Sequence, residues 1–110
     1  MVILALTACG KSGAGLSEDK IYFFFSNTCP HCHHALEYIN AKYPRLELAM
    51  VNVGNPEGLD LLVKAAQKFK LGNNVGTPLI VFGDKYLMGW TSDYETEFDK
   101  YVRPYAGTGQ

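Results

Sequence analysis

The chain has 110 residues, of which 47% are apolar, 13% aromatic and 19% charged, a composition typical of one small globular domain rather than a disordered chain. Ten lysines and arginines against eleven aspartates and glutamates give a net charge of −1. This argues against a nucleic-acid-binding surface, which needs an excess of basic residues. No apolar run reaches the roughly 18 residues of a membrane-spanning helix, and three cysteines are too few for a disulfide scaffold.

The first residues combine an apolar run, Val2 to Leu6, with the sequence Leu6-Thr7-Ala8-Cys9 and a flexible segment from Gly10 to Gly15. This pattern resembles a bacterial lipoprotein signal, in which Cys9 becomes the lipidated first residue of the mature protein. The resemblance implies a gene product that begins upstream with a basic residue and is exported to the cell envelope or periplasm, with Cys9 attached to the membrane. An incidental cysteine in the tail of a cytoplasmic protein is the alternative. Residues 1–19 are then a signal remnant and tether.

The folded part begins with a short, uninterrupted run of β-branched and aromatic residues, which predicts a strand buried on both faces at Ile21–Phe25. Apolar residues at helical spacing then predict a helix that starts about Pro30 and is stopped by Pro44. A second strand is expected at Leu46–Val53, where the apolar run resumes.

A second helix is predicted after that strand, because Asn55 is a natural N-cap and Pro56 suits the first helical position. Its expected apolar stripe consists of Leu59, Leu62, Val63, Ala66 and Phe69. The segment Gly72-Asn73-Asn74 is expected to close this helix.

The last part of the chain predicts two strands, Leu79–Phe82 and Tyr86–Met88, joined by a hairpin turn at Gly83-Asp84-Lys85. Ser92 and Glu95 have capping-box spacing for a final helix that reaches about Val102, before Pro104. The order β-α-β-α-β-β-α predicts an α/β fold at residues 20–105, with a four-stranded mixed sheet flanked by three helices. Residues 106–110 are expected to form a disordered tail.

The chemistry is expected at Cys29-Pro30-His31-Cys32, which follows the first strand and opens the first helix. Residues three apart on a helix are neighbours, so the two sulfur atoms can form a disulfide without backbone movement. Unpaired N–H groups and the helix dipole stabilise a Cys29 thiolate, Pro30 presets the first turn, and a protonated His31 would add positive charge. Such surroundings lower a cysteine pKa from about 8.5 to roughly 3.5–7.5. Cys29 is therefore the predicted nucleophile, and Cys32 the cysteine that resolves its mixed disulfides.

With this motif after a strand and at the start of a helix, the sequence resembles the thioredoxin superfamily. Gly76-Thr77-Pro78 before the third strand, Gly83 in the hairpin and Gly89-Trp90 before the last helix support the resemblance. It implies that Pro78 is cis and faces the disulfide. It also implies that Pro78 and the backbone of Thr77 align an extended substrate peptide. Trp90 either flanks this substrate groove or packs in the core.

Two branches of the superfamily share features with this chain. The C-P-H-C motif resembles that of DsbA, but only 45 residues separate Cys32 from Pro78, so the helical insertion of DsbA is absent. The Thr-Pro segment is similar to that of glutaredoxins and of DsbC-type isomerases. In glutaredoxins the segment that matches Gly89 to Asp93 helps to hold glutathione, which makes Thr77, Ser92 and Asp93 candidate glutathione-binding residues. Trp90 occupies the place of a glycine there.

The resemblance implies a monomeric thiol–disulfide oxidoreductase of a minimal glutaredoxin-like or Dsb-like type. Its partners would be protein thiols and disulfides and a redox partner that resets the Cys29–Cys32 disulfide. It implies no metal or organic cofactor beyond that disulfide, although glutathione could serve as a reactant.

Three alternatives arise from the same residues. The runner-up is a glutathione-dependent glutaredoxin. Cys29-x-x-Cys32-His33 also matches the attachment motif of a c-type haem, with Met50 or Met88 as the distal ligand. A zinc or copper site built from the cysteines and a neighbouring histidine is less favoured than the interpretation of His33 and His34 as solvated helix residues.

Overall fold

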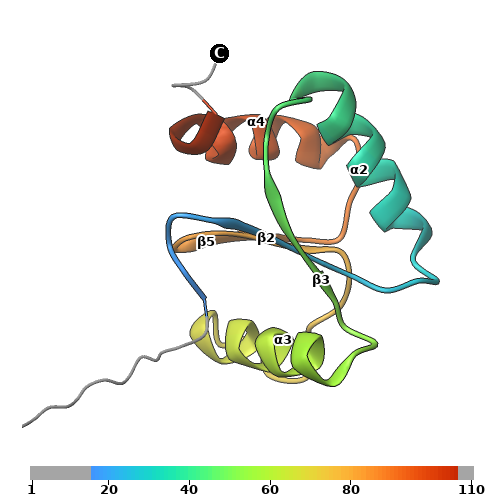
Figure 1. Cartoon of the computed structure of the whole chain (residues 1–110), viewed down its shortest axis with the longest axis vertical. Coiled ribbons are helices and arrows are strands. Elements are labelled where there is room, and N and C mark those ends of the chain that lie inside the picture. The colour runs from blue at the N-terminus through green and yellow to red at the C-terminus, as the bar shows by residue number, and fades with distance from the viewer. Residues whose placement is uncertain (1–15, 107–110) are drawn as a thin grey trace, which may run out of the picture.

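The computed structural model describes residues 16–106, and within them a mixed sheet of four strands has the order β3-β2-β4-β5 (Figure 1). The strands are β2 (Ile21–Phe25), β3 (Leu48–Asn52), β4 (Leu79–Phe82) and β5 (Lys85–Met88). β2 pairs with β3 in parallel and with β4 antiparallel, and β4 pairs with β5 antiparallel. The predicted α/β fold with a mixed four-stranded sheet is confirmed.

Three helices of the described residues flank this sheet: α2 (Pro30–Lys42), α3 (Pro56–Lys68) and α4 (Asp93–Ala106). α2 and α4 lie on one face of the sheet, and α3 covers the other (Figure 1). Among residues 16–106 no helix is long and apolar enough to span a membrane.

The core consists of two clusters that share β2, because successive side chains of a strand point to opposite faces. Ile21 and Phe23 pack in the cluster beneath α2 and α4, which also contains both cysteines of the C-P-H-C motif. Tyr22 and Phe24 pack in the cluster beneath α3. The uninterrupted apolar run of β2 therefore reflects its burial on both faces.

The predicted apolar stripe of α3 was wrong in part. Leu59 and Val63 are 51% and 46% exposed, and the residues of this helix that are buried are Gly58, Leu62, Ala65 and Ala66. Gly58 determines this orientation, because a Cβ atom there would lie 1.9 Å from the backbone oxygen of Asn52. The helix turns its glycine toward β3 and approaches the sheet closely, which leaves two larger apolar side chains on the outside.

Two predicted element ends also differ from the structure. β3 is confined to Leu48–Asn52, shorter than the expected strand from Leu46 to Val53. The last helix does not end before Pro104 but continues through it to Ala106. Tyr105 explains this continuation, because it packs against the first core cluster and its hydroxyl donates a hydrogen bond to the backbone oxygen of Glu18, 3.1 Å away. These contacts keep the last turn helical although Pro104 has no N–H group to donate a backbone hydrogen bond.

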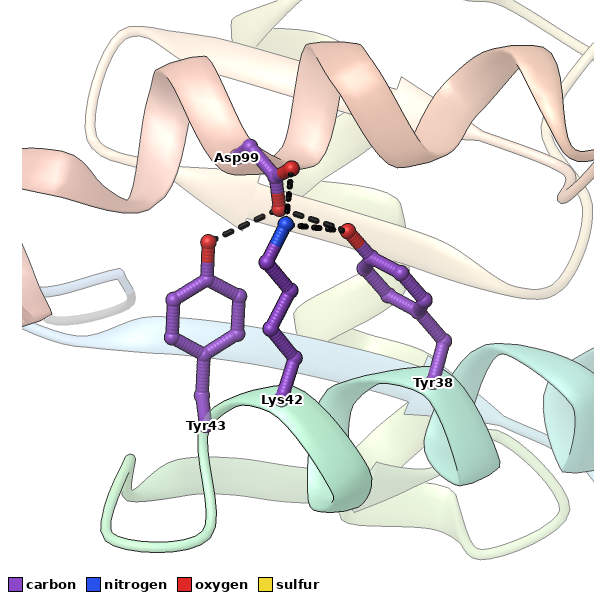
Figure 2. Close-up of polar contacts among 4 residues, drawn as sticks. All are labelled: Tyr38, Lys42, Tyr43 and Asp99. Carbon is purple, nitrogen blue, oxygen red and sulfur yellow. Dashed lines mark hydrogen bonds and ion pairs between the residues drawn. The ribbon is translucent and has the colours of Figure 1, made fainter.

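The carboxylate of Asp99 joins α4 to the C-terminal end of α2 (Figure 2). Its Oδ1 accepts hydrogen bonds from the hydroxyls of Tyr38 and Tyr43, at 2.7 and 2.8 Å, and its Oδ2 accepts one from Lys42 Nζ at 2.6 Å. Partial burial by itself would raise the pKa of the Asp99 carboxyl. The bonds from Lys42, Tyr38 and Tyr43 outweigh burial and hold this pKa below its usual value. Burial and the bond to Asp99 together raise the pKa of Tyr43 to about 12. We call these four residues the Asp99 clamp.

Replacing Asp99 by asparagine should destabilise the fold by about 1–3 kcal/mol, because hydrogen bonds to a charged acceptor contribute that much. Since folding lowers the pKa of Asp99, its ionised form stabilises the fold above the unfolded-state pKa of about 3.9, and this stabilisation is lost as the pH falls further. Urea unfolding of wild type and Asp99→Asn at pH 7 and at successively lower pH values measures both effects, and the difference should shrink below about pH 4.

The matched control is Asp60→Asn, which removes an exposed ion pair to Lys64 within a single helix. This pair should contribute less than about 0.5 kcal/mol. Equal destabilisation by the two variants at pH 7 would contradict the role of the clamp.

Candidate functional site

One end of the sheet gathers the segments that carry the predicted site. In the pairing of the strands Leu79 lies opposite both Phe24 and Met88. The end of β2, the start of β4 and the end of β5 therefore lie side by side at one end of the sheet, which we call the site edge. The chain leaves β2 toward the C-P-H-C motif, enters β4 from Thr77-Pro78 and leaves β5 toward Trp90, so all three predicted parts of the site start from this edge.

Cys29 and Cys32 form a disulfide, with their Cα atoms 5.3 Å apart. Cys29 is the N-cap of α2 and has an extended backbone, and Pro30 occupies the first turn. The Sγ atom of Cys29 accepts a hydrogen bond from the backbone N–H of Cys32 at 3.1 Å. At most helix starts the side-chain oxygen of the N-cap residue accepts a hydrogen bond from a free backbone N–H group, and here the sulfur of Cys29 has that role. In the reduced protein the same N–H group would donate a charge-assisted bond to a thiolate.

The two sulfur-bearing residues differ in access. Cys29 is 8% exposed and lies between the exposed residues Thr28 and Pro30, whereas Cys32 is 3% exposed and faces the core. The larger exposed fraction of Cys29 favours it as the first cysteine that a substrate sulfur meets, and the roles of nucleophile and resolving cysteine stay predictions. His31 is exposed on the first turn, beside this pair.

The Thr77–Pro78 peptide bond is cis, and Pro78 is fully buried while Thr77 is partly exposed. The carbonyl of Pro78 accepts a hydrogen bond from the N–H of Gly89 at 2.7 Å. Gly89 has φ +87°, a conformation that side chains rarely adopt, and it turns the chain from β5 toward Trp90. This bond ties the loop before β4 to the segment that leads into α4.

Trp90 is 6% exposed and packs against Tyr38 of α2 and Phe98 of α4, with ring centroids 5.7 and 6.0 Å apart. It also lines a hollow of about 610 Å³ between α2 and the start of α4. Trp90 therefore packs in the core and also forms part of the wall of a surface hollow.

This hollow, which we call the α2–α4 groove, joins residues from two elements. From α2 come His31, His34, Glu37 and Tyr38, and from the other side Trp90, Ser92 and Glu95. Of the predicted site residues, His31, Trp90 and Ser92 are thus brought together. Asp93, exposed at the first position of α4, and Thr77 are not part of this lining.

Glu37, Tyr38 and Glu95 line the groove although no sequence pattern singled them out, and His34, predicted as a solvated helix residue, lines it too. The spacing of His31, His34 and Tyr38 puts them on one side of α2, which is the signal that could have grouped them. The spacing of these residues does not show which side of α2 faces α4, because that depends on how the two helices pack.

The haem hypothesis finds no support in this arrangement. Both cysteine sulfurs are in the disulfide rather than free for attachment, and Met88 packs in the cluster on the opposite face of the sheet. The sulfur of Met88 accepts a hydrogen bond from the N–H of Gly76, and Met50 is exposed on β3. Within residues 16–106 no three His, Cys, Asp or Glu side chains are grouped so that they could hold a metal ion.

Comparison with solved structures identifies two glutaredoxins of similar fold. The glutaredoxin of Archaeoglobus fulgidus has a TM-score of 0.56 and 20% identity, over 84% of this chain and 99% of that one. Buckwheat glutaredoxin, solved as a glutathione complex, has a TM-score of 0.56 and 15% identity, over 80% of this chain and 76% of that one. No protein-family model and no curated protein matches the sequence. At these identities the likeness concerns the fold, which is thioredoxin-like in the form that glutaredoxins have.

The position of Cys29 leads to a prediction about its acidity. In the reduced Cys32→Ala variant, the rate of alkylation by iodoacetamide should follow a thiol pKa well below 8.5, within roughly 3.5–7.5, because the thiolate lies at a helix N-terminus. Cys29→Ala, made like the first variant in a Cys9→Ser background so that Cys32 is its one remaining thiol, is the control and should react more slowly, with a higher pKa. If Cys29 titrates at or above 8.5, the thiolate is not stabilised.

Proposed function

We propose that the protein is a thiol–disulfide oxidoreductase that exchanges disulfides with protein thiols. The observation that carries the proposal is the Cys29–Cys32 disulfide, whose more accessible sulfur is also the N-cap of α2. The fold shared with two glutaredoxins supports it. A sulfur at such a position combines access with a stabilised anionic form, as an exchanging cysteine requires.

In the reducing direction the Cys29 thiolate attacks one sulfur of a substrate disulfide. This forms a mixed disulfide and releases the other substrate sulfur as a thiolate. The Cys32 thiolate then attacks the Sγ atom of Cys29, which forms the Cys29–Cys32 disulfide and releases the second substrate thiolate. Two electrons pass to the substrate, and the same steps in reverse oxidise a substrate dithiol.

The loop before β4 is the proposed aligning surface for the substrate backbone. It enters the sheet at the edge from which the chain also leads to Cys29, and its conformation is tied to the segment before Trp90 through the bond between Pro78 and Gly89. The backbone at Thr77 would pair with an extended substrate segment, as in strand addition to a sheet edge.

The order of attack can be tested by trapping. Cys32→Ser should accumulate a mixed disulfide with a disulfide-bonded model peptide, because nothing resolves the bond at Cys29. Cys29→Ser should accumulate little, since Cys32 is buried. Non-reducing mass spectrometry identifies the cysteine that carries the adduct. Adducts mainly on Cys32, or none on either variant, would refute the mechanism.

A glutathione-dependent glutaredoxin is the second candidate, because both similar structures are glutaredoxins and one was solved with glutathione. The same preparation distinguishes the candidates. Saturable glutathione binding, with efficient reduction of glutathionylated peptides, would favour a glutaredoxin. Exchange with peptide disulfides that does not depend on glutathione favours the proposed activity.

We further propose that the protein acts in the bacterial cell envelope and is acylated on Cys9. This rests on Leu6-Thr7-Ala8-Cys9 alone, since Cys9 lies outside the described residues. In cells that express the native gene, mass spectrometry of the N-terminus should find a lipid-modified Cys9 in the membrane fraction. The Cys9→Ser variant should lose membrane attachment. An unmodified Cys9 in the soluble cytosolic fraction would refute this setting and leave the exchange chemistry unaffected.

A further inference from the structure

The α2–α4 groove follows α2 from His31, which belongs to the C-P-H-C motif, to Glu37 and Tyr38. His31 lies between the two cysteines in sequence, and His34 and Glu37 follow along the same side of the helix. The six residue steps along the helix from His31 to Glu37 correspond to about 9 Å. An extended peptide advances about 3.3 Å per residue, so this length corresponds to two or three residues of a bound substrate.

The groove has an aromatic wall. Trp90 and Tyr38 are in contact at 5.7 Å between ring centroids, and both line the hollow. The hydroxyl of Tyr38 is fixed by its bond to Asp99, so the ring is held in place from the far side. Such a wall can pack against the methylene stem of a long side chain whose charged end remains hydrated.

Two carboxylates come from opposite sides of the groove, Glu37 from α2 and Glu95 from the first turn of α4. Within residues 16–106 neither takes part in an ion pair, and the described lining contains no lysine or arginine. Lys42, one turn beyond Tyr38, is bound to Asp99 in the Asp99 clamp. The groove thus places two carboxylates, which no lysine or arginine of the described lining neutralises, beside an apolar wall.

We propose that the α2–α4 groove is a subsite for a cationic side chain of the substrate polypeptide, two or three residues from the cysteine that exchanges with Cys29. This rests on the proposed function, because it assumes that a polypeptide disulfide binds at Cys29. The stem of an arginine or lysine packs against Trp90 and Tyr38, and its charge lies between Glu37 and Glu95. An acidic side chain at the same place is disfavoured by repulsion from both carboxylates.

The test measures kcat/KM for disulfide-linked model peptides that differ at one position. That position, two or three residues on either side of the peptide cysteine, carries arginine, its neutral isostere citrulline, or glutamate. In the wild type, arginine should exceed citrulline by about fivefold at one or more of these positions, the size expected for two partly exposed ion pairs. Glutamate should fall below citrulline. All assays use one pH, so that the charge on the two groove histidines is the same in every comparison.

Glu37→Gln/Glu95→Gln should reduce the arginine-to-citrulline ratio toward one, whereas the control Glu47→Gln, an exposed glutamate outside the groove, should retain it. The comparison uses this ratio because a nearby cation also alters the reactivity of the peptide's own sulfur. High salt should lower the wild-type ratio by screening, which tests the charge effect without any substitution.

Equal rates for arginine and citrulline peptides in the wild type would overturn the inference, as would a preference that both high salt and the double variant leave unchanged. In either case exchange with the citrulline peptides would leave the proposed function intact. If no peptide disulfide is exchanged at any position, it is the proposed function that fails.

Discussion

The burial of β2 on both of its faces is the constraint on which the rest of the structure depends. Its side chains alternate between the two core clusters, so α2 and α4 on one face and α3 on the other are packed against alternate residues of the same strand (Figure 1). Its two neighbours, β3 and β4, run in opposite directions. As a result, the strand that leads to Cys29 ends where the chain enters β4 from Pro78. The C-P-H-C motif therefore starts directly from the sheet rather than from an isolated loop.

α2 has two anchors, one at each end. At its start the sulfur of Cys29 caps the first turn, and near its end the Asp99 clamp joins it to α4. A change of redox state replaces a disulfide by two thiols at the first anchor only. Because the clamp lies toward the opposite end of α2 from the cysteines and contains no sulfur, it can hold the orientation of α2, and with it the width of the α2–α4 groove, in both redox states.

Local sequence patterns were sufficient for the limits of β2 and β4, for the starts of α2 and α3, and for placing the C-P-H-C motif at the start of a helix. The reactivity of its cysteines stays a prediction. β2 and β4 have the predicted limits because they are buried on both faces, and Pro30 and Pro56 mark helix starts through their fixed φ angle. The patterns failed where tertiary contact decided the outcome. A close approach at Gly58 turned α3 and exposed part of its expected stripe. α4 continues past Pro104 because of another tertiary contact, the hydrogen bond from Tyr105 to the distant residue Glu18.

The same distinction separates chemistry from recognition in the site. The predicted reactivity of Cys29 depends on the first turn of α2, where the N–H group of Cys32 bonds its sulfur, so it is encoded within a few consecutive residues and can be predicted from the sequence. Recognition in the proposed subsite would instead depend on side chains that α2 and the start of α4 contribute jointly, and on the distance between those helices. Substitutions on the groove side of either helix can therefore change which polypeptides are bound while the cap at Cys29 is retained. A fold like that of two glutaredoxins is for this reason compatible with a different substrate, because the proposed recognition depends on side chains of the α2–α4 groove such as Glu37 and Glu95 and not on the fold alone.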